Sequence, residues 1–199
     1  KIIMSKIQQV KGRQVFDSRG NPTVEAEIIL ENGLTGTAIV PSGASTGRHE
    51  AHELRDNNKD YLNKSVFDAV NNINNKISKT LINKNSTEQS EIDKILINLD
   101  GTDNKSNIGA NAILAVSIAN LKAAAKFDNK EIYRFLNNKT NSTFSMPYPL
   151  MNIINGGAHA NNSLEIQEFM IRPDGAKNFN ECMQMSFLVI QNLKKNLEN

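Results

Sequence analysis

Two short stretches of the sequence carry side chains that could bind a charged ligand or move a proton. The first, PSGASTG at residues 41–47, follows a proline with six small residues, of which three carry hydroxyl groups and two are glycines. Such a run buries almost no apolar surface, and holding it in one shape costs chain entropy. It is either a surface turn or a mobile lid whose oxygens, that of Ser42 among them, close on a charged ligand or a metal.

The second stretch, NGGAHANNSLEIQEF, covers residues 155–169. Strand alternation places Glu168 in an apolar row, and a carboxylate there needs a partner or takes part in acid–base chemistry. An Arg or Lys on a neighbouring strand could supply that partner. Gln167 faces the other way and could be exposed, and His159 lies among small and polar residues, where it could simply face solvent. Residue types alone leave these alternatives open.

The first stretch follows residues that alternate as strands do. Between residues 5 and 41, the segment Thr23 to Leu30 puts Val24, Ala26, Ile28 and Leu30 on one face. Asn32-Gly33 predicts a hairpin turn because both residues tolerate positive φ. Leu34 to Val40 is then the partner strand, which ends at PSGASTG. The lid candidate is therefore expected at a strand end, where functional loops are commonly found.

Between Arg48 and Asn138 the pattern is helical. A helix is predicted over Leu62 to Thr80, with a core stripe at Leu62, Val66, Val70, Ile73 and Ile77. Ser86 and Gln89 are expected to form a capping box for the next helix. The Ala-rich run from Ala110 to Lys126 predicts a helix buried on most sides, and residues 131–138 predict a short one.

The pattern changes after residues 140–149, which hold Ser, Thr, Asn and two prolines and predict a domain boundary. We expect an α+β domain, a three-stranded antiparallel meander plus helices, over residues 1–140. Over 147–199, two strands (Leu150 to Ile154 and Leu164 to Ile171) and a helix capped by Asn178 and Glu181 predict the start of a TIM-like β/α barrel. A whole barrel takes about 250 residues, so this second domain is expected to be truncated.

Composition narrows the range of functions. The 199 residues carry 23 Lys and Arg against 21 Asp and Glu, a net charge of +2, without a basic patch interleaved with aromatics, so nucleic acid is not expected as a direct partner. The single cysteine excludes an internal disulfide framework and favours a reducing compartment. No apolar run approaches the roughly 20 residues of a membrane span, and no signal peptide is visible. We therefore expect a cytoplasmic protein.

Several long motifs, in order along the chain, resemble the enolase family and are most similar to its bacterial members. They are DSRGNPTVE at 17–25, PSGASTG at 41–47 with ELRD at 53–56, DGT at 100–102, GANAILAVS at 109–117, NIINGG at 152–157 followed by His159, and QEFM at 167–170. The resemblance spans essentially the whole chain. The resemblance also decides between a surface turn and a mobile lid for PSGASTG, because it implies that this stretch is a lid.

The resemblance implies a lyase that reversibly dehydrates 2-phosphoglycerate to phosphoenolpyruvate in glycolysis with two Mg²⁺ ions, and that works as a homodimer. It implies that Ser42 ligates the second, substrate-bridging Mg²⁺. His159, Gln167 and Glu168 would line the substrate pocket, with His159 and Glu168 catalytic and Glu168 in the proton-donor network. The family's base, proton donor and carboxylate metal ligands lie beyond Asn199, so the chain as given is expected to be an incomplete, inactive fragment.

Two other classes of function remain possible on the sequence. One is a non-catalytic binding role, at the cell surface or in an RNA-degrading assembly, as enolases can have; it would add a cell-surface or secreted pool to the cytoplasmic one. The other is a different acid–base lyase of the same superfamily. Asn57 and Asn63 stand where the family commonly has glycine, and both are expected to keep the positive φ that glycine allows.

Overall fold

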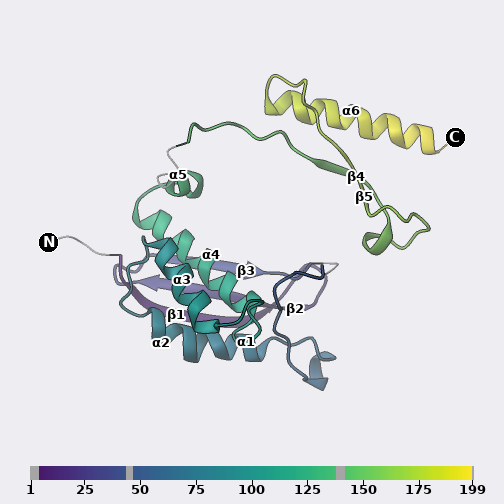
Figure 1. Cartoon of the computed structure of the whole chain (residues 1–199). Helices are drawn as coiled ribbons and strands as arrows, with labels where there is room; N and C mark the ends of the chain where they lie inside the picture. The colour runs from purple at the N-terminus through teal and green to yellow at the C-terminus, as the bar shows by residue number, and fades with distance from the viewer. Residues whose placement is uncertain (1–4, 44–46, 138–141, 199) are drawn as a thin grey trace. The chain divides into compact units, whose positions relative to one another are not determined.

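The computed structural model describes residues 5–43, 47–137 and 142–198 (Figure 1). Ala44, Ser45 and Thr46 of the PSGASTG motif therefore lie outside the described residues. The chain divides into two compact units, Lys1–Asn141 and Ser142–Asn199. Each unit is described by itself. Among the described residues, no helix combines the length and the apolar character needed to cross a lipid bilayer.

The first unit is built on a three-stranded antiparallel meander, as expected. Its strands β1 (Ile7–Phe16), β2 (Pro22–Leu30) and β3 (Thr35–Val40) lie in the order β1-β2-β3. The apolar face predicted for β2 is confirmed, since Val24, Ala26, Ile28 and Leu30 are all fully buried. The hairpin turn is also confirmed, although only Gly33 takes a positive φ, of 82°.

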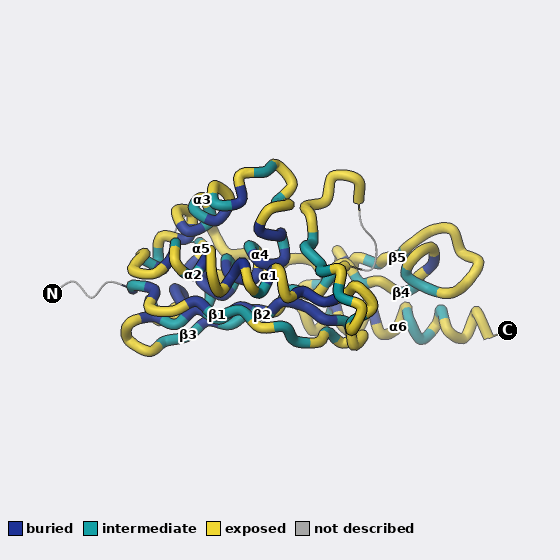
Figure 2. The backbone as a smooth tube through the Cα atoms, turned by 90° about the horizontal axis from the view of Figure 1, so that it is seen from below, coloured by how far each residue is buried: buried dark blue, intermediate teal, exposed yellow. Residues whose placement is uncertain are grey.

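Helices cover the buried face of this sheet (Figure 1). A continuous helical segment lies against β1 and consists of α1 (Phe67–Asn72), a π-helical turn (Ile73–Ile77) and α2 (Ser78–Leu81). The expected Ala-rich helix is α4 (Ala110–Phe127), which packs on β2 and β3, and α3 (Gln89–Asp100) packs on α4. The buried backbone of the unit is concentrated in these strands and helices (Figure 2).

The contact between α4 and the sheet requires small residues on both sides. A Cβ atom on Gly36 of β3 would lie 2.1 Å from the carbonyl oxygen of Ala119 and 2.5 Å from the backbone nitrogen of Ala123. On the helix, Ala112, Ala115, Ala119 and Ala123 are fully buried. The Ala-rich composition of α4 thus sets how closely the helix lies on the strands.

Three expectations for the helical region are wrong. Leu62 is 82% exposed, because it ends a short 3₁₀ turn (Lys59–Tyr61) with a φ of 53°. The helix begins only at Phe67, where the carboxylate of Asp56 accepts the backbone N–H groups of Phe67 at 2.7 Å and Asp68 at 2.9 Å. Most of the chain between residues 48 and 58 is irregular, not helical. Asn63 has the positive φ expected, at 61°, whereas Asn57 does not.

The expected capping box of α3 is also wrong. The α3 helix begins at Gln89, and its N-cap residue Glu88 makes no side-chain capping bond. The buried Ser86 hydroxyl points instead to the carbonyl oxygen of Asn120 at 3.5 Å, and the Gln89 amide donates to the carbonyl oxygen of Ser117 at 3.2 Å. The two side chains therefore tie the start of α3 and the segment before it to α4, a tertiary role that the local motif does not reveal.

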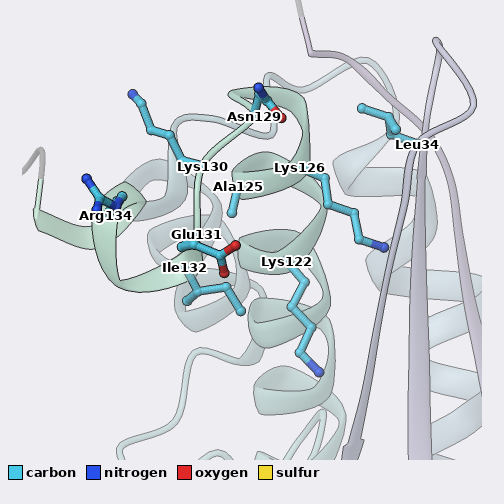
Figure 3. A pocket seen from close by; sticks show the side chains of 9 residues that line it. All are labelled: Leu34, Lys122, Ala125, Lys126, Asn129, Lys130, Glu131, Ile132 and Arg134. Carbon is cyan, nitrogen blue, oxygen red and sulfur yellow. The ribbon is translucent and has the colours of Figure 1, made fainter.

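Lysines of α4 cover the free edge of β3. Lys122 donates to the carbonyl oxygen of Thr37 at 2.9 Å, and Lys126 donates to that of Thr35 at 2.7 Å. A hollow lies beside them, between the end of α4 and the short helix α5 (Ile132–Asn137), but the cationic side chains around it diverge (Figure 3). We interpret Lys122 and Lys126 as protection of an edge strand and not as an anion site.

The second unit contains an antiparallel pair of strands and a long helix. The strands are β4 (Met151–Asn155) and β5 (Glu168–Ile171), so the strand expected from Leu164 is shorter than predicted. The helix α6 (Phe179–Leu197) begins as expected, with the Asn178 side chain accepting the N–H of Glu181 at 3.0 Å. Within this unit Cys182 is buried, while most of the apolar residues on α6 are exposed.

A buried carboxylate, Asp100, organises the loop between α3 and α4. It is 2% exposed and accepts the backbone N–H groups of Ile108 at 2.7 Å, Thr102 at 3.0 Å and Asn107 at 3.1 Å. Burial by itself would raise the pKa of this carboxyl, but the hydrogen bonds from Thr102, Ile108 and Asn107 outweigh it and hold the pKa below its ordinary value. The charged form of Asp100 therefore stabilises the folded unit.

The stability of the first unit should depend on pH through Asp100. The pKa of Asp100 is lower in the folded state than in the unfolded state. The stabilisation by charged Asp100 is therefore fully present above the unfolded-state pKa of about 3.9, and it is lost as the pH falls through the folded-state pKa. Asp100→Asn should lower the free energy of unfolding by about 2 kcal/mol near pH 7, and the difference should shrink below about pH 4. Hydrogen exchange of the α3 and α4 backbone amides, compared between wild type and variant, measures this difference in the free energy of unfolding. Asp103→Asn, an exposed residue of the same loop, should change little.

Candidate active site

The second unit folds a tight loop between β4 and β5. Asn155 pairs with Glu168 across the two strands, and the N–H of Gly156 donates to the carbonyl oxygen of Gln167 at 2.9 Å. A Cβ atom on Gly156 would lie only 2.4 Å from the carbonyl oxygen of Ile166, so glycine is required there. The loop therefore turns back on itself at Gly156, which brings His159 close to the start of β5.

His159 lies between two side chains from the start of β5. Its Nδ1 is 2.9 Å from Oε1 of Glu168, and its Nε2 is 2.6 Å from Nε2 of Gln167. A carboxylate only accepts hydrogen bonds, so Nδ1 must carry a hydrogen. In the neutral ring Nε2 is then an acceptor, and the Gln167 amide can donate to it. These two partners assign one tautomer to the ring.

This geometry settles the partners that the residue types left open. The partner of Glu168 is His159 and not an Arg or Lys of a neighbouring strand, and Gln167 contacts the same ring from its other side. The apolar row expected around Glu168 is not formed, since Leu164 and Ile166 lie in the loop and are exposed. The trio is a consequence of loop closure, which strand alternation could not predict.

The trio has the composition of a proton-transfer site. The side chains of His159 and Glu168 are 23% and 28% exposed, so the pair is sheltered but reachable. The Glu168 carboxylate accepts the Nδ1 hydrogen and orients the imidazole, which is one task of a carboxylate behind a catalytic histidine. Such a pair can take up or deliver a proton at a bound molecule.

Ser42 belongs to the first unit, directly after β3, and its neighbours form a second candidate site. Its Oγ accepts a hydrogen bond from Arg55 at 3.2 Å, and Arg55 also forms an ion pair with Glu53 at 2.8 Å. Ser42 lines a hollow together with Glu50 and Glu53. The sequence motif indicated Ser42, but nothing in it identified Arg55 or Glu53 as its neighbours.

The segment that carries Glu53 and Arg55 is held against the start of α4. The Asn111 amide accepts the N–H of Leu54 at 3.2 Å and donates to the Leu54 carbonyl oxygen at 3.0 Å. His52 donates its N–H to the carbonyl oxygen of Asn104 at 2.7 Å, and its own carbonyl accepts from Ala110 at 2.8 Å. The α4 helix thereby positions one side of the hollow.

The oxygens around Ser42 suit a hard cation. Mg²⁺ binds hydroxyl, carbonyl and carboxylate oxygens, and Ser42 and Glu50 present such groups at one hollow, while the Glu53 carboxylate beside them is paired with Arg55. The set is incomplete, because no cluster of three or more His, Cys, Asp or Glu side chains able to hold a metal is found among the described residues. Ser42 fits as one ligand of such an ion, and further ligands must come from elsewhere.

The fold and these sites define a class of protein: an α+β domain with a serine-bearing loop, followed by the first elements of a β/α barrel domain that carries acid–base side chains. Residues 7–136 match the family described as "Enolase, N-terminal domain", and residues 143–199 match "Enolase, C-terminal TIM barrel domain". The chain belongs to the enolase family.

A curated relative gives the same result at the level of the whole sequence. The chain is 63% identical over 193 residues to a protein named "Enolase" from Pelagibacter ubique (strain HTCC1062). The aligned part covers 96% of this chain but 46% of the relative, so the chain spans about half the length of the curated relative.

Proposed function

We propose that the full-length protein containing this chain is a phosphopyruvate hydratase, a lyase that reversibly converts 2-phosphoglycerate to phosphoenolpyruvate and water in glycolysis. The observation that carries the proposal is the 63% identity to a protein named "Enolase" over 96% of this chain. The sheltered His159–Glu168 pair supports it, since the reaction requires proton transfers at the substrate.

In this proposal His159, Gln167 and Glu168 line the substrate pocket. Glu168 holds the hydrogen at Nδ1 of His159 and thereby directs Nε2 of the ring toward Gln167. The Gln167 amide can rotate to offer its oxygen if the ring becomes charged, so the trio keeps its hydrogen bonds in both protonation states. Glu168 and His159 are the catalytic groups that we assign to this chain.

We also propose that Ser42 contributes oxygen ligands to a substrate-bound Mg²⁺. When bound, that cation supplies positive charge that stabilises the negative charge developing on the substrate. Pro41, Ser42 and Gly43 all line the hollow at which this cation would bind. We further propose domains at 1–140 and 147–199, a homodimer and a cytoplasmic location for the full-length protein.

The proposed activity is tested by incubating the full-length protein with 2-phosphoglycerate and Mg²⁺ and following phosphoenolpyruvate by its ultraviolet absorbance. We expect turnover that stops when a chelator removes the metal and returns when Mg²⁺ is added back. The 199-residue chain serves as a comparison, because its described residues hold no cluster of metal-binding carboxylates, and we expect no turnover from it. A full-length protein that folds but does not consume 2-phosphoglycerate would contradict the proposal.

A further inference from the structure

The Arg55 guanidinium is a fixed point at the hollow that Ser42 lines. It donates to the Glu53 carboxylate at 2.8 Å, to the Pro22 carbonyl oxygen at 3.1 Å and to the Lys64 carbonyl oxygen. These three acceptors lie on different segments of the first unit, so the planar group is held from several directions. The fourth contact is the Ser42 hydroxyl, at 3.2 Å.

This arrangement determines how the Ser42 hydroxyl can be used. A guanidinium has only donors, so the Ser42 oxygen must act as the acceptor between them. The hydroxyl hydrogen must then point away from Arg55, and one lone pair of the oxygen remains available for another partner. Because Arg55 is anchored and Ser42 follows the end of β3, Arg55 sets both the position and the orientation of the hydroxyl.

The charge of Arg55 would by itself repel a cation at Ser42. Glu53 removes this effect, because its carboxylate forms an ion pair with the guanidinium and lines the same hollow. The Arg55–Glu53 pair therefore has no net charge, and it affects Ser42 through the hydrogen bond from Arg55. Removing Arg55 alone would leave the Glu53 carboxylate unpaired. That carboxylate would attract cations, and the stronger attraction would mask any weakening of cation binding caused by a misplaced Ser42 hydroxyl.

We propose that Arg55, held by Glu53, is a positioning residue that orients the Ser42 hydroxyl for the substrate-bound cation. The inference rests on the proposed function of Ser42 as a ligand of that cation. Arg55 itself touches neither the cation nor the reacting atoms in this assignment. Its effect on the cation passes through the single hydrogen bond to Ser42.

The test uses a charge-neutral pair of substitutions, Arg55→Gln with Glu53→Gln, in the full-length protein. Mn²⁺ is the probe, titrated by calorimetry in the presence of the equilibrium mixture of 2-phosphoglycerate and phosphoenolpyruvate. We expect the second Mn²⁺ to bind at least tenfold more weakly than in the wild type, with the first unchanged. Arg55→Lys, which keeps the charge but not the planar fork, should show a smaller loss in the same direction.

Two further variants separate positioning from general structure. Lys130→Gln with Asp128→Asn removes another ion pair between residues two apart, and should leave Mn²⁺ binding as in the wild type. Adding the Arg55 and Glu53 substitutions to Ser42→Ala should weaken the second Mn²⁺ no further than Ser42→Ala does, because the effect passes through Ser42.

The inference would be overturned by a second Mn²⁺ that binds the Arg55 and Glu53 variant normally, or by losses that add to those of Ser42→Ala. A wild-type protein that binds only one Mn²⁺, or turns over no substrate, would instead overturn the proposed role of Ser42 on which the inference rests. The titration of the wild-type protein therefore distinguishes a failure of the Arg55 inference from a failure of the proposed role of Ser42.

Discussion

Replacing Glu168 with Gln in the full-length protein should lower the turnover of 2-phosphoglycerate by about 100- to 10,000-fold. Glu168 accepts the hydrogen of His159 Nδ1 over a distance of 2.9 Å. A neutral amide of the same size offers one acceptor oxygen instead of two, and its NH₂ group can turn a donor toward the hydrogen on Nδ1. Steady-state kinetics at saturating substrate and Mg²⁺ measures the loss of kcat.

The control for this variant is Glu165→Gln. Glu165 lies in the same loop, three residues before Glu168, and is exposed, so the substitution makes the same change of charge without touching His159. Its turnover should stay close to that of the wild type. If Glu168→Gln instead lowers the melting temperature strongly and leaves kcat almost unchanged, the His159–Glu168 pair has only a structural role.

Ser42→Ala in the full-length protein should lower turnover by about 100- to 1,000-fold, comparable to the loss of one group that stabilises developing charge. The substitution removes the hydroxyl oxygen proposed as a cation ligand and retains the backbone carbonyl. Among the described residues, this hydroxyl makes one hydrogen bond, to Arg55 at 3.2 Å. The free energy of unfolding should therefore change by no more than about 1 kcal/mol.

The measurement is the dependence of turnover on Mg²⁺ concentration. For Ser42→Ala the concentration that gives half-maximal rate should rise, while the circular dichroism spectrum stays that of the wild type. Ser106→Ala, an exposed serine in the loop between α3 and α4, is the matched control and should leave the Mg²⁺ dependence unchanged. Normal turnover of Ser42→Ala at limiting Mg²⁺ would contradict the assignment of Ser42 as a ligand.

The sequence by itself determined the framework of the first unit. Alternation in β2 predicted which side chains are buried, because strand periodicity depends on local backbone geometry. The Ala-rich run predicted α4 for a similar local reason. Family resemblance, carried by long ordered motifs, identified Ser42, His159, Gln167 and Glu168 as candidates. The family matches agree with that resemblance.

Local patterns failed where a side chain finds its partner far along the chain. Ser86 and Gln89 have the spacing of a capping box, but their hydroxyl and amide bind α4 carbonyl groups, because buried polar groups must be satisfied wherever a partner lies. Leu62 fits the helical stripe in spacing, yet the helix starts later, at the N–H groups that Asp56 accepts. The spacing of residues along the chain indicates the periodicity of a helix or strand, but it does not indicate which hydrogen-bond partner the folded chain places beside a side chain.

The tertiary structure alone decided how the candidate residues are arranged. Gly156 lets the loop fold onto the backbone before β5, and this closure puts the His159 ring between Gln167 and Glu168. Arg55 reaches Ser42 because the segment around Leu54 is fixed to α4 by Asn111. Hydrogen bonds act over about 3 Å, and contacts between residues far apart in sequence form only after the chain has folded, so residue spacing cannot encode them.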